Sequence, residues 1–256
     1  MNAAAHKIAI RSIYRMYCSF YLQNVLLFFW QGGMIMNAQW EAIRQRHSVR
    51  QYLDQRIPDE IREKLDQYAE ELNQAGDLHL QILYDEPECF SSRMAHYGRF
   101  ENARNYIAAV GKKSPDLDER CGFYGEMLVL KAQELGLNTC WAALTHGKSK
   151  AVIGADEKEV IIIALGYGKT QGSDRKSKRA SAVSNITAED PAWFKRGVKA
   201  ALLAPTAVNQ QNFKLERNKD TVTAKAGLIG TCLKIDLGIV KCHFELGAGK
   251  ENFRWG

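Results

Sequence analysis

The chain has 256 residues, of which 46% are hydrophobic and 25% are charged. These values are typical of a folded globular protein, and they exclude a disordered chain, a fibre and a protein with many membrane spans. Lys and Arg number 35 against 29 Asp and Glu, which gives a formal net charge of +6. A mild excess of cations fits a nucleic acid, a membrane or a phosphorylated ligand, so the positions of the cations must decide among these partners.

The six cysteines are scattered along the chain and form no Cys-x-x-Cys pair. No Cys/His spacing resembles a zinc site, so no metal centre is expected. Isolated thiols in a chain of this size are typical of a reducing compartment. The sequence therefore predicts a cytoplasmic protein.

Residues 1–35 differ from the rest of the chain. Three cations precede a stretch, 16–40, that contains no charged residue. A signal peptide would show a small-residue cleavage site after its apolar core, and none is evident. The densest apolar run, 25–30, is much shorter than the roughly 20 residues that cross a membrane. We therefore expect residues 1–35 to be an extension outside the folded domain, with a membrane anchor as the alternative.

From Met36 onward, apolar residues recur with the spacing of alternating helices and strands. Pro58 is well placed to open a helix that ends near Gly76. The segment 125–135 is apolar almost all round, which is typical of a buried helix, and the apolar run 160–165 is typical of a strand covered on both faces. Without long repeats or low-complexity linkers, the pattern predicts one α+β domain over 36–256. The other expected elements are a helix from Met36 to Ile43, strands at 78–84 and 106–110, a helix over 191–202, a hairpin of 213–215 and 222–224, and a helix over 233–244.

A basic segment, Arg46-His47-Ser48-Val49-Arg50, follows the first expected helix. Guanidinium groups can bind phosphate oxygens through two parallel hydrogen bonds, and a serine hydroxyl adds a neutral donor. The segment therefore fits a phosphate site. The alternative for this segment alone is a solvated basic turn.

A second basic segment, 175–179, follows the buried strand and the sequence Gly166-Tyr167-Gly168-Lys169. The glycine spacing differs from that of a dinucleotide-binding loop, and a polar basic stretch stands where the amphipathic helix of such a loop would begin. No aromatic side chain is interleaved with the cations of 175–179, which disfavours nucleic-acid binding.

A third segment, 204–213, places several amides between a helix and a strand. Amide side chains offer both donors and acceptors, so they suit a ligand that has both kinds of polar edge. Capping of the loop by these amides is the alternative.

Together these segments resemble the nitroreductase family of flavin enzymes. Residues 46–50 are similar to the family's opening signature, and residues 136–141 are similar to its central helix-to-loop segment. Residues 165–178 are similar to its late strand and basic tail, and residues 204–211 are similar to its A-P-S-x-x-N-x-Q motif. In most members the Asn/Gln motif closely follows the Arg-Ser-Arg motif, whereas here more than half of the chain separates them. This order resembles the branch called putative TM nitroreductases.

The resemblance implies a nitroreductase-like α+β fold, with a central, mostly antiparallel sheet flanked by helices. It implies non-covalent flavin mononucleotide (FMN) as cofactor, NAD(P)H as reductant, and a nitroaromatic, quinone or related small molecule as acceptor in a ping-pong reaction. The reactive atoms would belong to the flavin, so no catalytic side chain is expected. A homodimer is also implied.

The resemblance further implies roles for ten residues. The phosphate would be held by Arg46, Ser48, Lys176 and Lys178. His47 would line the ribityl chain, and Arg50 would approach the pyrimidine edge of the ring. Asn209 and Gln211 would bond the ring edge. The backbone around Ala142 and Ala143 would offer N–H groups near the flavin N5.

Three alternatives remain at this stage. The first is a Rossmann-type dehydrogenase, which the glycine spacing and the polar stretch after 166–169 disfavour. In the second, a member of the same family carries out another flavin reaction, such as dehydrogenation or dehalogenation. The third is a basic nucleic-acid-binding module, although neither nucleic acid nor a membrane is expected as a partner.

Overall fold

The computed structural model describes residues 38–256, and residues 40–256 form one unit. The expected extension 1–35 lies outside the described residues. A short helix occupies residues 38–45 and runs into the first basic segment. Among the helices of residues 38–256, none combines the length and the apolar character that crossing a membrane requires.

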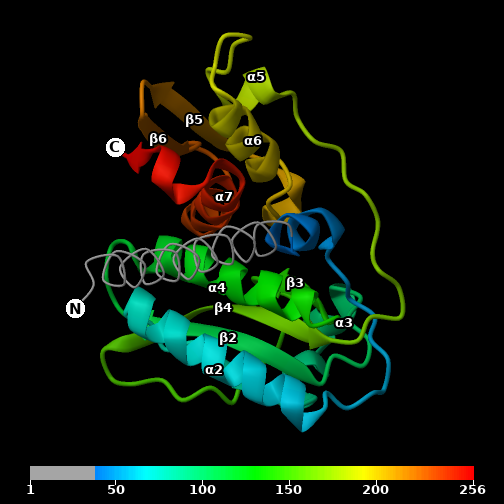
Figure 1. The fold of residues 1–256 in the computed structure, drawn as a ribbon. Helices are drawn as coiled ribbons and strands as arrows, with labels where there is room; N and C mark the ends of the chain where they lie inside the picture. The colour runs from blue at the N-terminus through cyan, green and yellow to red at the C-terminus, as the bar shows by residue number, and fades with distance from the viewer. Residues whose placement is uncertain (1–37) are drawn as a thin grey trace, which may run out of the picture. The chain divides into compact units, whose positions relative to one another are not determined.

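A four-stranded antiparallel sheet lies at the centre of the first half of this unit (Figure 1). Its order is β1 (Gln81–Leu83), β2 (Asn105–Lys112), β4 (Glu157–Gly166) and β3 (Asn138–Ala142). Side chains alternate between the two faces of a strand, and both faces are buried along nearly all of β2 and along residues 161–166 of β4. Ile107 and Ile163 face the core that includes residues of α2 (Asp59–Gly76) and α4 (Leu117–Glu134). Tyr106 and Ile162 belong to a second core formed with the segment 89–103.

The second half contains a smaller sheet and two further helices. The hairpin of β5 (Phe213–Asn218) and β6 (Thr221–Ala226) is extended by β7 (Arg254–Trp255), which runs parallel to β6. α6 (Ala192–Ala201) and α7 (Leu233–Ala248) pack together, and Phe194 meets Phe244 edge to face at a centroid distance of 5.9 Å. The short elements are the helices α3 (Arg93–Tyr97) and α5 (Ala180–Val183) and the 3-10 helices at Glu88–Phe90, Ala207–Asn209 and Lys250–Asn252.

Helices α4 and α7 cross at a pair of glycines. A Cβ atom on Gly122 would lie 2.1 Å from the carbonyl oxygen of Ile235, and a Cβ atom on Gly238 would lie 2.0 Å from that of Glu119. Each glycine thus faces the backbone three residues before the other glycine, so the crossing is reciprocal. Such a close approach requires residues without a side chain.

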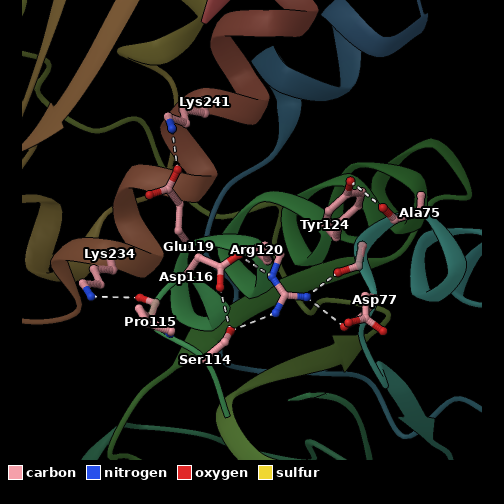
Figure 2. Close-up of polar contacts among 11 residues, drawn as sticks. Ala75, Asp77, Ser114, Pro115, Asp116, Glu119, Arg120, Tyr124, Lys234 and Lys241 are labelled. Atoms are coloured by element: carbon pink, nitrogen blue, oxygen red, sulfur yellow. Dashed lines mark hydrogen bonds and ion pairs between the residues drawn. The ribbon is translucent and has the colours of Figure 1, made fainter. Parts of the chain in front are cut away.

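Polar contacts fix the N-terminal end of α4 to its neighbours (Figure 2). Arg120 donates to the carbonyl oxygens of Gly76 and Asp77 at the end of α2, at 2.6 and 2.8 Å. On the other side, Lys241 of α7 forms an ion pair with Glu119, and Lys234 donates to the Pro115 carbonyl at 3.0 Å. α4 therefore joins the two halves of residues 40–256.

The expected fold class, an α+β protein with a mostly antiparallel sheet, is confirmed. Three details differ. The helix expected at 125–135 begins at Leu117, because its first turns carry the polar residues that contact α2 and α7. The segment 138–142 is strand β3 rather than a loop, and the strand expected at 78–84 is reduced to Gln81–Leu83.

If α3 and the short 3-10 helices are left out, the order helix, antiparallel strand pair, helix, strand occurs twice, as α2-β1-β2-α4-β3 and as α6-β5-β6-α7-β7. No long repeat is evident in the sequence, so the similarity lies in the order of the elements. The repeated order places α4 and α7 in equivalent positions, consistent with their reciprocal crossing.

We predict that Gly122→Ala lowers the free energy of unfolding by about 3 kcal/mol or more, because the added Cβ meets backbone that cannot rotate away. Urea denaturation of the two proteins measures the difference. Gly154→Ala is the control, since its Cβ would meet only the side chain of Glu157. Equal losses in the two variants would contradict the role of the crossing.

Candidate functional site

The first basic segment leaves helix 38–45 and joins the edge of the central sheet. The Arg46 N–H donates to the Ala42 carbonyl at 2.9 Å, and the Val49 N–H donates to the Thr139 carbonyl of β3 at 3.0 Å. Because alternate residues of an extended segment point to opposite sides, Val49 is buried while Ser48 and Arg50 are exposed. Arg46, however, is only 1% exposed.

The Arg46 guanidinium lies beside a buried acid of α4. Its Nε atom is 3.6 Å from Oε1 of Glu126, a residue that is 0% exposed. Glu126 also accepts from Trp141 Nε1 at 2.9 Å, and its Oε1 lies 2.8 Å from Nε2 of His243 on α7. One carboxylate thus contacts the first basic segment, β3 and α7.

A second arginine, Arg175, lies near this pair. Burial is the main cause that lowers the pKa of Arg46, and burial together with the Arg46 charge lowers the pKa of Arg175 to about 10. Within residues 38–256, no group accepts a hydrogen bond from the three guanidinium nitrogens of Arg46 or from Nε and Nη2 of Arg175. Buried guanidinium donors are normally paired, so these donors could hold an anionic ligand.

A cavity of about 110 Å³ lies next to this region. A single water needs only about 10–15 Å³ on such a measure, so the space accommodates a larger group. Its walls come from the first basic segment, the end of β3, the segment after α6 and the start of α7. The lining residues are Ser48, Arg50, Trp141, Ala143, Ile161, Pro205, Thr206, Ala207, Val208, Cys232, Ile235, Asp236 and Ile239.

The wall formed by 205–211 is held in an unusual backbone conformation. Val208, Asn209 and Gln211 all have positive φ angles, at 46°, 54° and 44°. This region is a strained one for a β-branched residue such as Val208. The carboxylate of Asp236 on α7 accepts from the Ala207 N–H at 3.1 Å and from Gln210 Nε2 at 2.7 Å, which fixes the loop to the helix.

The amide side chains of this loop bond to the second basic segment. Gln211 accepts from the Lys178 N–H at 2.8 Å and donates to the Lys176 carbonyl at 2.9 Å. Asn209 donates to the same carbonyl at 2.9 Å, and Lys178 Nζ donates to the Gln211 carbonyl at 3.1 Å. These contacts make the amides anchors of the segment 176–178.

The structure brings together some of the residues that the sequence singled out. Ser48, Arg50 and Ala143 line one cavity, and Ala142 lies buried at the end of β3. Lys176 and Lys178 do not line this cavity. They contact Asn209 and Gln211 through the hydrogen bonds given above. His47 lines a separate open cavity of about 670 Å³, where its Nε2 is 3.8 Å from Asp174.

The sequence analysis missed Glu126, Arg175 and Asp236 as parts of the site. Glu126 could have been found, because it is the one acid in the otherwise apolar stretch 125–130. The inward direction of the Arg175 side chain could not be predicted from the sequence. Four polar residues follow it, and an irregular segment has no periodicity that would show which of the five side chains points inward.

The family model described as putative TM nitroreductase matches residues 38–248. The chain belongs to this family. Membership makes it an oxidoreductase of the nitroreductase type. The match covers the sheet, α2, α4 and α6, and ends at the C-terminus of α7.

One solved structure supports the fold, and two others match the chain less closely. The crystal structure of a putative nitroreductase from Thermotoga maritima is 26% identical, with a TM-score of 0.61 over 83% of this chain and 84% of that chain. An FMN-dependent nitroreductase from Clostridium difficile is 17% identical, with a TM-score of 0.43 over 58% of this chain and 98% of its own. A putative nitroreductase from Desulfovibrio desulfuricans, solved in complex with FMN, is 20% identical, with a TM-score of 0.43 over 60% and 96%. No curated protein sequence matches the chain.

The carboxyl group of Asp236 makes the free energy of unfolding depend on pH. Burial raises its pKa from 3.8 to about 6. A carboxyl with a raised pKa in the folded state stabilises the fold at low pH, and this contribution is lost as the pH rises through about 6. We predict that the difference in unfolding free energy between wild type and Asp236→Asn changes by about 2–3 kcal/mol between pH 4 and pH 7, measured by urea denaturation.

The matched control is Asp54→Asn, which removes an exposed carboxylate that is paired with Arg104. The same pH dependence in both variants would contradict the assignment to Asp236.

Proposed function

We infer that the protein is an FMN-dependent oxidoreductase that uses NAD(P)H to reduce nitroaromatic, quinone or related small-molecule acceptors by a ping-pong mechanism. The observation that carries this inference is a set of five buried guanidinium nitrogens, three of Arg46 and two of Arg175, that have no hydrogen-bond partner within residues 38–256. Membership of the nitroreductase family supports the reaction class.

The charges near Arg46 fit the phosphate of FMN. Two guanidiniums face a single carboxylate, so the buried cluster has an excess of positive charge. A phosphate monoester carries a charge of about −1.5 to −2 near neutral pH and offers three acceptor oxygens. The five unpartnered guanidinium nitrogens supply the matching donors. We therefore propose Arg46 and Arg175 as the main phosphate ligands, with Ser48, Lys176 and Lys178 as the further ones that the family resemblance implies.

The cavity fits one end of the flavin ring. Its walls combine apolar side chains, including Trp141 and Ile161, with the cation Arg50 and the backbone of 205–208. When bound, FMN would supply the hydride chemistry, taking electrons from NAD(P)H and passing them to the acceptor. The side chains of the cavity would bind and orient the ring rather than react.

The individual residues would contribute in different ways. Arg50 would place a positive charge near the pyrimidine edge, which stabilises negative charge on the reduced ring. Trp141, fixed by its bond to Glu126, would exclude water from one side. The backbone at Ala142 and Ala143 would provide N–H donors near N5, and His47 would lie toward the ribityl chain. Asn209 and Gln211 would act at the ring edge through the loop that they stabilise.

The location proposed is the cytoplasm. The five cysteines among the described residues are all free, which supports a reducing compartment. The physiological partners would be small molecules and, by the family resemblance, a second copy of the chain.

We predict that Arg46→Ala weakens FMN binding about 10- to 100-fold, because a charge-assisted hydrogen bond contributes about 1.5–3 kcal/mol. Arg175→Gln should weaken FMN binding similarly. Riboflavin, which lacks the phosphate, should bind wild type and both variants with the same weak affinity. Fluorescence titration of the purified protein measures these affinities, and its visible spectrum shows first whether flavin is present.

The exposed Lys112→Ala variant, which removes a cation outside the site, is the control. If Arg46→Ala and Arg175→Gln bind FMN as tightly as this control does, the phosphate assignment is wrong.

The homodimer implied by the resemblance stays a prediction. Because the cavity walls at 48–50, 141–143, 205–208 and 232–239 come from one chain, we expect one FMN per chain and an affinity that does not depend on protein concentration. Sedimentation of the FMN-loaded protein at several concentrations tests both points. Loss of FMN whenever the protein dissociates would show instead that two chains complete the site.

A further inference from the structure

We propose that Glu126 is a positioning residue that acts as the internal counter-ion of the phosphate site, holding Arg46 and Arg175 in place before the ligand binds. This inference rests on the proposed phosphate site, but it concerns the protein without its ligand. Glu126 lies on α4, and its side chain is completely buried.

Hydrogen-bond donors contact both oxygens of the Glu126 carboxylate. Trp141 Nε1 donates to Oε2 at 2.9 Å, and His243 Nε2 lies 2.8 Å from Oε1. Burial lowers the pKa of His243, which favours a neutral ring with its single N–H on the nitrogen that makes the shorter contact. The other ring nitrogen, Nδ1, is 3.2 Å from the Ala200 carbonyl. Donors from two elements thus surround a carboxylate that cannot move to another partner.

The distance between Arg46 Nε and Glu126 Oε1 shows that the two side chains form an ion pair without a hydrogen bond. At 3.6 Å, Arg46 Nε is too far from Oε1 for a good hydrogen bond but close enough for strong attraction in a buried site. The attraction lowers the cost of burying the guanidinium, while every N–H of that guanidinium stays available. A direct bidentate pair would instead have used the donors that a phosphate needs.

The charge of Arg175 makes this counter-ion necessary. Arg46 and Arg175 repel each other, and Glu126 attracts both. Without a bound anion, removing the negative charge of Glu126 would leave the buried cation of Arg46 beside the half-buried cation of Arg175, which is unfavourable. A bound phosphate would replace the missing negative charge. The loss of Glu126 should therefore harm the ligand-free protein more than the FMN-loaded protein.

The test is Glu126→Gln in the full chain. Glutamine keeps an acceptor for Trp141. Its amide can donate to His243 Nε2 when the neutral ring carries its N–H on Nδ1, where the Ala200 carbonyl accepts it. The variant therefore removes the charge and preserves the shape. We expect its melting temperature without ligand to fall below that of wild type, and the increase caused by saturating FMN to exceed that of wild type by at least about 2 °C.

Asp190→Asn is the matched control. Asp190 is a largely buried acid that pairs with Arg217 at 2.5 Å, remote in sequence from the site. This variant should lower the melting temperature equally with and without FMN. If Glu126→Gln behaves in the same way as this control, or melts as wild type does, Glu126 is not a counter-ion and the proposal is overturned.

A double variant tests whether the two arginines repel each other when Glu126 is neutralised. Removing one of the repelling cations should restore stability, so Glu126→Gln/Arg175→Gln without ligand should melt at a higher temperature than Glu126→Gln alone. If the single variant does not fold, the double variant should still fold, and its failure would overturn the proposal. If FMN leaves the wild-type melting temperature unchanged, the phosphate site itself is wrong, and the ligand-free comparison still decides the role of Glu126.

Discussion

The arrangement of the site depends on burying Arg46 beside Glu126. A buried guanidinium is costly unless charge and hydrogen bonds compensate it, and here only the charge is supplied by the protein. Glu126 can meet this need only if α4 is in its observed position, and it also contacts β3 through Trp141 and α7 through His243. One ion pair therefore constrains three segments that are far apart in the sequence.

The close crossing of α4 and α7 makes that contact possible. The reciprocal glycines let the two backbones approach until carbonyl oxygens fill the space of the missing side chains. Because α7 carries Asp236 and His243, the same crossing brings the second half of residues 40–256 to the cavity. This explains how motifs separated by more than half of the chain contribute to one site. The repeated order of elements in the two halves accounts for the symmetry of the crossing.

Sequence patterns predicted the elements that have strong periodicity or clear boundaries, such as α2 after Pro58, the covered strand β4, the β5–β6 hairpin and α7. They failed where tertiary contacts decide the structure. The polar first turns of α4 gain their partners only in the folded chain, and β3 is a five-residue edge strand whose pairing with β4 defines it. The motifs singled out the basic and amide segments, and the structure brings Lys176 and Lys178 into contact with Gln211. The side-chain directions in these segments, in particular the inward turn of Arg175, depend on contacts that no local pattern encodes.

The loop 205–211 connects the two ends of the site through a continuous set of hydrogen bonds. Asp236 fixes Ala207 at the cavity, and Gln211 fixes the backbone of Lys176 and Lys178, next to Arg175. Val208 adopts a left-handed conformation that is unfavourable for valine, so the surrounding contacts must offset that strain. A loop held at both ends in this way has little freedom to adjust. The segment 176–178 and the cavity wall at Ala207 are therefore held by one loop, which connects the proposed phosphate site to the proposed ring site.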